Sequence, residues 1–330
     1  MALRTSGAFG RVGGGIVGAA LAVLAAFGCA TGPRLEYTPT ELRDEASRRA
    51  SDLEASEIEV PFELGPEPVA RARSVLRTSA RETRMQALVN ALSDPAVFGL
   101  RYEWATTAPA AATLERGAGN CFSLSSVLVG LARGAGLRAY YVEVDVAEPE
   151  WRHDGAVMVQ ADHIAAVVVQ RGQRVYVDFS GKLDRANRVR VIGDLEALAH
   201  FYNNRGYELL HLAERAGEPP PWEEAGRAFE VATRLEPGMA RAWSNLGVAR
   251  ARLGDSQGAK QAYEQAIEVS ANAPSAHLNL ALLHLREGAL DDAAMHLRAA
   301  GRLDPRNPQL EGLRHALRVE GVDPEAPGAD

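Results

Sequence analysis

The hydrophobic positions between residues 69 and 92 repeat with the period of an α-helix. They are Val69, Val75, Leu76, Met85, Leu88, Val89 and Leu92. This spacing predicts one helical stripe that stops at Asp94-Pro95. A second helix is predicted through "APAAATLER", with Thr106 or Thr107 as its cap and its break at Gly117 and Gly119.

The stretch that begins at Cys121 has the same period and then gives way to strands. Its apolar residues follow the i, i+3, i+4, i+7 rule and are Leu124, Val127, Leu128 and Leu131. Gly134 and Gly136 are predicted to end this helix. Three segments after it, "LRAYYVEVDV", "HIAAVVVQ" and "RVYVDFS", are rich in β-branched and aromatic residues. Arg171 and Gly172 alone separate the last two segments, which predicts a β-hairpin.

The C-terminal third of the chain repeats with a period of 34 residues. Trp243, Leu246, Gly247, Ala259, Tyr263 and Ala266 are followed 34 positions later by His277, Leu280, Ala281, Ala293, Leu297 and Ala300. This period, with small residues where helices cross, resembles tetratricopeptide repeats. The first repeat helix is expected at about residues 199–215, and "PQLEGLRHALRV" is expected to cap the array. The resemblance implies an all-α array over residues 196–320 that binds a protein or peptide partner.

The first 28 residues have the pattern of an export signal, since a short apolar run follows two arginines and no acidic residue precedes Glu36. The run ends in "AAFGCATG", which resembles the lipobox of bacterial lipoproteins. That resemblance implies cleavage before Cys29 and lipidation of its thiol. It places the protein on the periplasmic side of a bacterial cell envelope, and Ala30 favours the outer membrane. An ordinary secretory signal with an incidental cysteine is the alternative.

Composition limits the partners and the cysteine chemistry. A net charge of −7 provides no basic field, so no nucleic-acid partner is predicted, whereas 46% hydrophobic residues suffice for packed cores. The chain has two cysteines, and lipidation of Cys29 leaves Cys121 without a disulfide partner. Residues 29–64 are polar and charge-rich, which predicts a tether with at most one short exposed helix, and residues 321–330 are predicted to form a disordered tail.

Cys121 follows a Gly-Ala-Gly-Asn turn at the start of the predicted helix. A helix N-terminus favours the thiolate, the reactive form of cysteine, because its backbone N–H groups carry partial positive charge. The alternative is that Cys121 is a small core residue after a loop. The three serines that follow, Ser123, Ser125 and Ser126, are interpreted as polar positions of the helix.

The hairpin after this helix can supply a base and an acceptor that orients it. With a two-residue turn, Gln170 pairs with Gln173 and His163 lies opposite Ser180. Asp178 is two residues from Ser180, so it shares the face of His163 and is its diagonal neighbour. A three-residue turn would put the two side chains on opposite faces. The predicted triad therefore depends on that turn.

Three motifs carry a resemblance to the transglutaminase-like superfamily, whose members have a papain-like fold. They are "GNCFSLSSVLVGLARGAGLRAYYVEV", "DHIAAVVV" and "VYVDFSG", within about residues 65–185. The resemblance implies an α+β papain-like domain over residues 65–195. It implies that Cys121 is the nucleophile, His163 the general base and Asp178 the residue that orients the imidazole. It also implies acyl transfer from glutamine, peptide hydrolysis or related amide chemistry, which some members have lost.

Several alternatives stay open at this point. Ala165 stands where the family often has an aromatic residue, and the oxyanion donor could be the Cys121 N–H or the side chain of Asn120 or Trp104. His153 could compete as the base, although it lies in the polar segment "EPEWRHDG", which predicts a loop. The repeat histidines lack metal-ligand spacing, so neither a metal nor a cofactor is predicted. The alternative to an enzyme is a repeat-mediated interaction scaffold with a vestigial cysteine domain.

Overall fold

The computed structural model describes most of the chain from residue 34 onward. The described residues are 34–51, 53–80, 84–104, 106–146, 151–154, 157–160, 163–170, 173–183 and 186–325. The predicted signal, Cys29, the Arg171-Gly172 turn and the end of the predicted tail lie outside them. Among the helices of the described part, none is both long enough and apolar enough to cross a bilayer.

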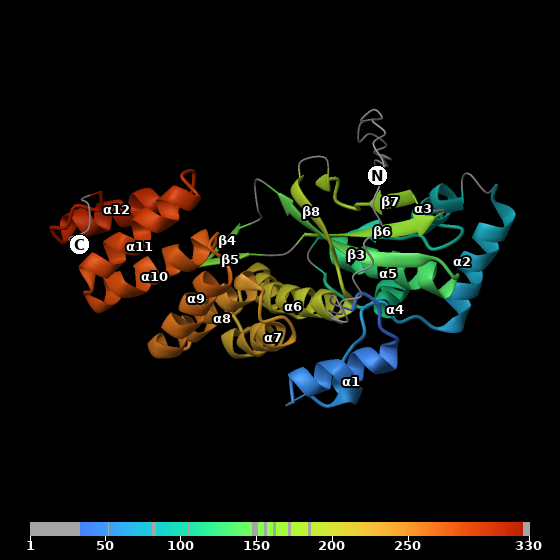
Figure 1. The fold of residues 1–330 in the computed structure, drawn as a ribbon, viewed down its shortest axis with the longest axis horizontal. Coiled ribbons are helices and arrows are strands. Elements are labelled where there is room, and N and C mark those ends of the chain that lie inside the picture. The colour runs from blue at the N-terminus through green and yellow to red at the C-terminus, as the bar shows by residue number, and fades with distance from the viewer. Residues whose placement is uncertain are drawn as a thin grey trace, which may run out of the picture.

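The chain folds into an α/β part followed by an array of helices (Figure 1). The first elements are α1 (Pro39–Arg49), the 3₁₀ helix η1 (Ala55–Glu57), α2 (Pro66–Thr78), α3 (Arg84–Ser93), β1 (Arg101–Tyr102), α4 (Ala110–Arg116), β2 (Ala118–Gly119) and α5 (Cys121–Gly134). The strands that follow are β3 (Arg138–Val146), β4 (Trp151–Asp154), β5 (Val157–Gln160), β6 (Ile164–Gln170), β7 (Gln173–Val177) and β8 (Ala186–Ile192). The array consists of α6 (Asp194–Ala216), α7 (Trp222–Leu235), α8 (Ala240–Arg252), α9 (Ser256–Val269), α10 (Pro274–Glu287), α11 (Leu290–Leu303) and α12 (Gln309–Val319).

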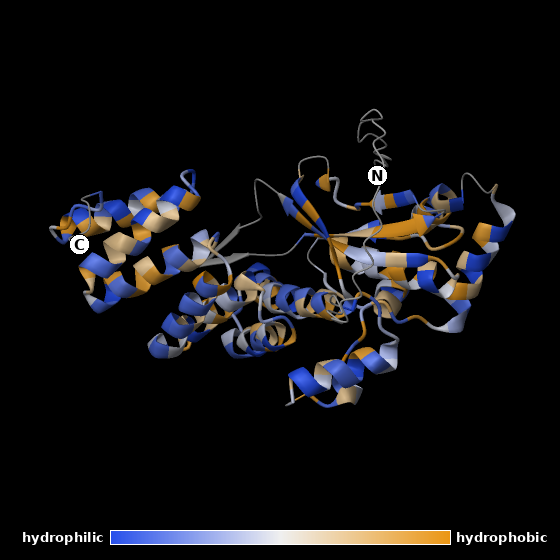
Figure 2. Cartoon of the chain, in the orientation of Figure 1, coloured by the Kyte–Doolittle hydropathy of each residue, from blue (hydrophilic) through white to orange (hydrophobic). Residues whose placement is uncertain are grey.

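A four-stranded antiparallel sheet with the order β7-β6-β3-β8 supports α5 on one face. Figure 2 shows β6 as strongly hydrophobic. Its residues Ile164, Ala166 and Val168 belong to the main core, while Ala165 and Val167 belong to a smaller cluster. Alternate side chains of a strand point to opposite faces, so both faces of β6 are buried. This burial explains its continuous apolar sequence.

The predicted helix at Cys121 and the three predicted strands are present as α5, β3, β6 and β7. Other details differ. The stripe over residues 69–92 forms two helices, α2 and α3, and α4 begins after Pro109, so neither Thr106 nor Thr107 caps it. The segment expected as a loop around His153 contains β4, which pairs with β5 in a separate two-stranded sheet. Strand β8 was not predicted, because its alternating arginines give it the sequence of an exposed edge strand.

The part of the expected tether that the structure describes, residues 34–64, is packed into the fold. Leu42 of α1 is fully buried, and Ile58, Val60 and Phe62 belong to the main core. The tether prediction is therefore wrong for this segment. A low density of apolar residues suggested a solvated chain, but these few side chains all reach the core of the α/β part.

The α/β part and the first repeat helices share one continuous core. Leu198 and Phe201 of α6 and Leu235 of α7 belong to the same buried cluster as Phe122 of α5 and Tyr141 of β3. Helix α6 starts directly after Gly193, five residues before the predicted start of the first repeat helix. The predicted boundary between residues 195 and 196 therefore falls inside a packed helix, with no linker there.

In each repeat, a small residue on the first helix packs against a large side chain of the second helix. A Cβ on Gly206 would lie 2.6 Å from the Phe229 ring, and one on Gly247 would lie 2.5 Å from the Tyr263 ring. In the next repeat the matching buried residues are Ala281 and Leu297. The 34-residue pattern thus reflects the closest approach of paired helices.

Replacing Gly247 by alanine is expected to lower the free energy of unfolding by about 1–3 kcal/mol, because the added methyl group overpacks the Tyr263 ring. Urea unfolding followed by circular dichroism measures this change. Gly312→Ala in α12 is the matched control, since nothing lies within 4 Å of its added Cβ. Helix propensity predicts that this control is neutral or stabilising. Equal losses in both variants would contradict the packing explanation.

Candidate active site

Cys121 is the first residue of α5, and the preceding turn places it there. The Asn120 side-chain oxygen accepts a hydrogen bond from the Ser123 N–H at 3.0 Å, which caps the helix. A Cβ on Gly119 would lie 2.7 Å from the Ser123 Cβ, so this position requires glycine. In the first helical turn the Cys121 N–H has no acceptor within the helix. The local sequence therefore presents a thiol and a backbone donor together.

The serines of α5 are buried, although they were interpreted only as polar positions. The Ser126 hydroxyl donates to the Phe122 carbonyl at 2.9 Å and accepts from the Tyr141 hydroxyl at 3.0 Å. The Ser125 hydroxyl donates to the Ile164 carbonyl at 3.3 Å. Because Ile164 follows His163, this bond ties the helix of the thiol to the strand of the imidazole.

The observed strand register brings His163 and Asp178 together. Gln170 pairs with Gln173, as a two-residue turn predicts, although the turn residues themselves lie outside the described part. His163 Nε2 lies 3.3 Å from Asp178 Oδ1 and 2.9 Å from the Ser180 Oγ. Nε2 therefore interacts with Asp178 and Ser180, which leaves Nδ1 as the ring nitrogen that can interact with the Cys121 thiol.

Several donors hold the Asp178 carboxylate. It accepts hydrogen bonds from the Ser180 N–H at 2.9 Å, the Ser180 hydroxyl at 3.0 Å and the Leu183 N–H at 2.7 Å. Burial raises the pKa of Asp178, but His163 and these donors outweigh burial and keep the pKa well below its usual range. Sequence reasoning placed Ser180 opposite His163 without giving it a function. The structure adds it to the site as a link between imidazole and carboxylate.

The thiol and the imidazole favour each other's charged forms. Burial raises the pKa of Cys121. The hydrogen bond and the charge of His163 lower this pKa by more than burial raises it, so the net pKa lies below its ordinary value. Burial likewise lowers the pKa of His163, whereas Asp178 and Cys121 raise it to about 9. Cys121 is 7% exposed and His163 is 8% exposed. The site favours a buried thiolate–imidazolium pair.

The geometry narrows the choice of oxyanion donor. The Asn120 side chain caps α5 with its oxygen and donates from its nitrogen to the Thr107 hydroxyl at 2.8 Å, so it is committed to the fold. The Trp104 ring packs against His211 of α6 with ring centroids 4.3 Å apart. The Cys121 backbone N–H is the donor that the arrangement supports best.

Comparison with known families agrees with this geometry. Residues 70–180 match a model of the transglutaminase-like superfamily, and residues 221–259 and 249–308 match a tetratricopeptide repeat model. The chain contains a transglutaminase-like domain followed by tetratricopeptide repeats. The resemblances to the transglutaminase-like superfamily and to tetratricopeptide repeats are confirmed, as is the predicted α+β domain with an all-α array.

Individual relatives are similar to one part of the chain. The heat-shock protein cognate co-chaperone sgt12 of Aspergillus fumigatus is 35% identical over 112 residues, which are 30% of this chain and 32% of that protein. The chain thus spans about a third of that curated relative. The Arabidopsis OM64 TPR domain has 22% identity and a TM-score of 0.32 over 35% of this chain and 93% of its own. PcrH in complex with the chaperone binding region of PopD has 28% identity and a TM-score of 0.29 over 35% and 85%.

The first repeat helix holds a loop of the transglutaminase-like domain beside Cys121. Glu208 of α6 accepts a hydrogen bond from the Thr107 N–H at 2.9 Å, and Arg205 donates to the Thr107 carbonyl at 3.2 Å. On the other side, the Thr106 carbonyl accepts from the Asn120 N–H at 3.1 Å. The loop therefore connects α6 directly to the N-terminus of α5.

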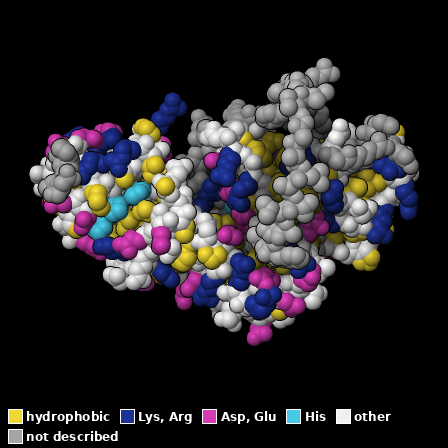
Figure 3. Space-filling model, viewed as in Figure 1, with side chains coloured by type: hydrophobic (Ala, Val, Ile, Leu, Met, Phe, Trp, Pro, Cys, Tyr) yellow, Lys and Arg dark blue, Asp and Glu magenta, His cyan; other side chains and the backbone are white. Residues whose placement is uncertain are grey.

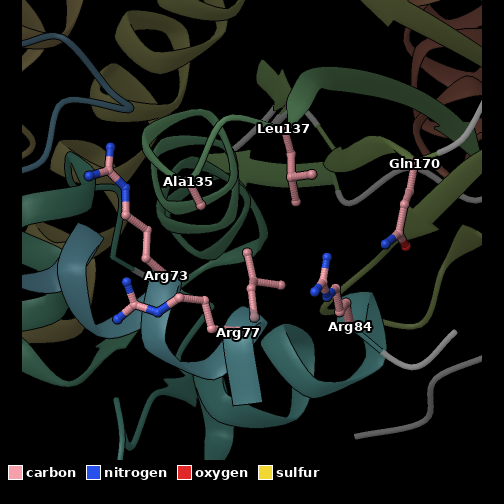
Figure 4. Close-up of a pocket in the computed structure, with 7 residues that line it drawn as sticks. Arg73, Arg77, Arg84, Ala135, Leu137 and Gln170 are labelled. Atoms are coloured by element: carbon pink, nitrogen blue, oxygen red, sulfur yellow. The ribbon is translucent and has the colours of Figure 1, made fainter. Parts of the chain in front are cut away.

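A cavity of about 250 Å³ lies at the opposite end of α5 from the thiol. Arg73, Arg77 and Arg84 border it, together with Ala135 and Leu137, as Figure 4 shows. Since α5 has 14 residues, this cavity is about 20 Å from Cys121. It is not part of the thiol site of the transglutaminase-like domain.

Histidine side chains gather on one face of the repeats (Figure 3). His277 Nδ1 lies 3.0 Å from His296 Nδ1, and the His284 ring stacks on that of His296 with centroids 5.6 Å apart. Burial, followed by these two neighbours, lowers the pKa of His296 to about 4. Within the described residues, no group of three or more His, Cys, Asp or Glu side chains has an arrangement that could hold a metal ion.

Proposed function

We propose that the transglutaminase-like domain carries out thiol-dependent acyl chemistry on an amide of a protein substrate. The observation that supports this proposal is the contact of Cys121 with His163 and of His163 with Asp178 in one buried site. The pKa of the thiol is lowered and that of the imidazole is raised, which is the direction that a reactive ion pair requires.

The chemistry proceeds in two steps. The Cys121 thiolate attacks the amide carbonyl carbon and forms a C–S bond, and the His163 imidazolium gives its proton to the amine that leaves as the C–N bond breaks. Water or a second amine then attacks the thioester and gives its proton to His163, and the Cys121 thiolate leaves. Asp178 orients the imidazole, and the Cys121 N–H stabilises the oxyanion. Water gives hydrolysis, and an amine gives transamidation.

The rest of the chain supplies location and recruitment in this proposal. The repeats bind the protein substrate or a partner that carries it. Lipidation at Cys29 anchors the protein on the periplasmic side of a bacterial envelope, with the outer membrane favoured. The lipobox-like "AAFGCATG" and the preceding apolar run support this location.

The pH dependence of Cys121 alkylation tests the ion pair. In a Cys29→Ala chain only one thiol reacts with iodoacetamide. The rate is expected to reach half its plateau below the ordinary thiol pKa of about 8.5, because His163 stabilises the thiolate. Substrate turnover is expected to fall as the pH rises through about 9, where His163 loses its proton. A half-plateau at or above the ordinary thiol pKa would contradict the proposal.

The low exposure of the thiol and imidazole favours a second candidate function. With Cys121 7% exposed and His163 8% exposed, access for a substrate requires movement of the surrounding chain. An interaction scaffold with a vestigial cysteine domain needs no such access. An inert thiol in the alkylation experiment, with partner binding retained, supports the scaffold over the enzyme.

A further inference from the structure

The cavity at the opposite end of α5 from the thiol has positive charge in its wall, and we call it the arginine cavity. Its volume is about 250 Å³, and it lies among α2, α3 and the ends of α5 and β6. Arg73, Arg77 and Arg84 supply the charge, and the side-chain amide of Gln170 adds a neutral donor. The other residues of the wall are apolar and are Leu76, Ala135 and Leu137. No acidic residue is among the described residues that line this cavity.

The positive charge of the arginine cavity is not neutralised within the described part of the chain. None of its three arginines has an ion pair with a described carboxylate. Arg73 donates to the Gly134 carbonyl from Nε at 2.9 Å and from Nη2 at 2.6 Å. A helix C-terminus carries only about half a negative elementary charge, so Arg73 alone more than offsets the end of α5. The charges of Arg77 and Arg84 therefore remain for an anion.

Arg84 combines a buried donor with a helix N-terminus. Its Nε atom is buried and has no hydrogen-bond partner. Native structures pair nearly all buried donors, so this atom needs an explanation. Arg84 is also the first residue of α3, a helix of 10 residues, and a helix N-terminus carries partial positive charge. The side chain and the helix would both stabilise an anion at this position.

Hydrogen-bond donors line two sides of the arginine cavity. Figure 4 shows Arg84 and Gln170 on one side and Arg73 and Arg77 on the other. A guanidinium has five N–H donors in one plane, which match the oxygens of a carboxylate or a phosphate. A carboxylate has two oxygens and one negative charge. A phosphate monoester has three terminal oxygens and a charge of about −1.5 to −2 at pH 7, so it fits donors on two sides better.

We propose that the arginine cavity binds the phosphate group of a phosphate monoester. Arg77 and Arg84 bind the phosphate oxygens, and the apolar part of the wall contacts the carbon atoms of the ester. A cavity without an acidic side chain selects against ammonium groups, because nothing there compensates a positive charge. Since Cys121 is about 20 Å away, this site is separate from the thiol site. The proposal does not rest on the proposed acyl chemistry.

Isothermal titration calorimetry with glycerol 3-phosphate tests the site in the full Cys29→Ala chain. A dissociation constant of about 1 mM or tighter is expected. Arg84→Gln is expected to weaken binding at least about tenfold, because charge-assisted hydrogen bonds are lost. Arg318→Gln removes the same charge from an exposed position on α12 and should leave the affinity unchanged. Equal affinities of these two variants would overturn the proposal.

A lipid headgroup and a soluble ester have the same phosphate chemistry, and a second arm distinguishes them. Sedimentation measures binding to phosphatidylcholine vesicles with and without phosphatidic acid. Binding that requires phosphatidic acid and is lost in Arg84→Gln, but kept in Arg318→Gln, identifies a lipid headgroup. Binding of glycerol 3-phosphate without such vesicle binding identifies a soluble ester. If neither probe binds in a manner that depends on Arg84, the cavity is not a phosphate site.

A measurement without substitutions in the cavity covers variants that fail to fold. Phenylglyoxal modifies arginines of the Cys29→Ala chain, and mass spectrometry follows each site with and without glycerol 3-phosphate. With the ester at about ten times its dissociation constant, modification of Arg77 and Arg84 is expected to slow about tenfold. Modification of Arg318 should not change. Equal rates at Arg77 and Arg84 with and without saturating ester or phosphatidic acid vesicles would overturn the proposal.

Discussion

Replacing His163 by alanine is expected to reduce the alkylation rate of Cys121 at pH 6.5 by about 10- to 100-fold. With the pair intact, His163 lowers the pKa of the thiol, so a larger fraction of it is thiolate at this pH. An ordinary thiol of pKa about 8.5 is only about 1% ionised at pH 6.5, so the largest possible effect is about 100-fold. Without the imidazole, burial is the main influence left, and burial raises the pKa of the thiol. The rate with iodoacetamide across pH measures the change in the Cys29→Ala chain.

The control for this prediction is His315→Ala on α12, which removes an exposed histidine far along the repeats. It should leave the alkylation profile of Cys121 unchanged. Asp178→Asn offers an intermediate case, because His163 remains but loses the carboxylate that raises its pKa. If Cys121 is alkylated as fast in the His163→Ala variant as in the parent chain, the imidazole does not stabilise the thiolate and the proposed ion pair is wrong.

Replacing Asp194 by alanine is expected to lower the free energy of unfolding by about 3–5 kcal/mol, because it leaves the mostly buried guanidinium of Arg133 without its carboxylate partner. Asp194 accepts two hydrogen bonds from Arg133, at 2.7 and 2.9 Å, and a third from the Tyr37 N–H at 2.9 Å. Its side chain is fully buried. This carboxylate therefore joins α5, α6 and the N-terminal segment, and urea unfolding of the full chain measures its loss.

An exposed ion pair provides the comparison. Glu103→Ala removes the partner of Arg116, where both side chains are about half exposed, and should cost less than about 1 kcal/mol. A second comparison replaces both buried charges, as Arg133→Met with Asp194→Leu. This double variant should be more stable than Asp194→Ala alone, because no unpaired charge stays buried. Equal losses of unfolding free energy for Asp194→Ala and Glu103→Ala would contradict the prediction that the Arg133–Asp194 pair contributes more to stability than an exposed pair.

Local pattern was enough to predict the elements that carry the candidate triad. Apolar residues at helical spacing after Cys121 predicted α5, and the β-branched runs predicted β3, β6 and β7. Counting from a two-residue turn predicted the register that places His163 near Asp178. These predictions succeeded because each depends on contacts between residues close in sequence, where backbone geometry leaves few choices.

Contacts between residues distant in sequence could not be predicted from local pattern. The segment with Ile58 and Phe62 has too few apolar residues to show a pattern, yet it fills the core of a domain that begins later in the chain. Strand β8, which pairs with β3, was missed because its arginines interrupt the apolar pattern of a strand. Around the hairpin β4–β5, polar residues indicated a loop, whereas the structure has two paired strands against the repeats. Each outcome depends on partners distant in sequence.

By itself, the sequence determined a thiol at a helix N-terminus, an antiparallel hairpin that carries a histidine and an aspartate, and a repeat of 34 residues. Each of these features follows from the spacing of neighbouring residues. Only the tertiary structure decided that Ser180 joins His163 to Asp178, and that Asn120 is committed to capping α5. It also decided that β5 packs against α8 and α10. These arrangements depend on which surfaces pack together. Segments far apart in sequence decide which side chains are buried and which hydrogen bonds form, and the local sequence pattern holds no information about such pairs of segments.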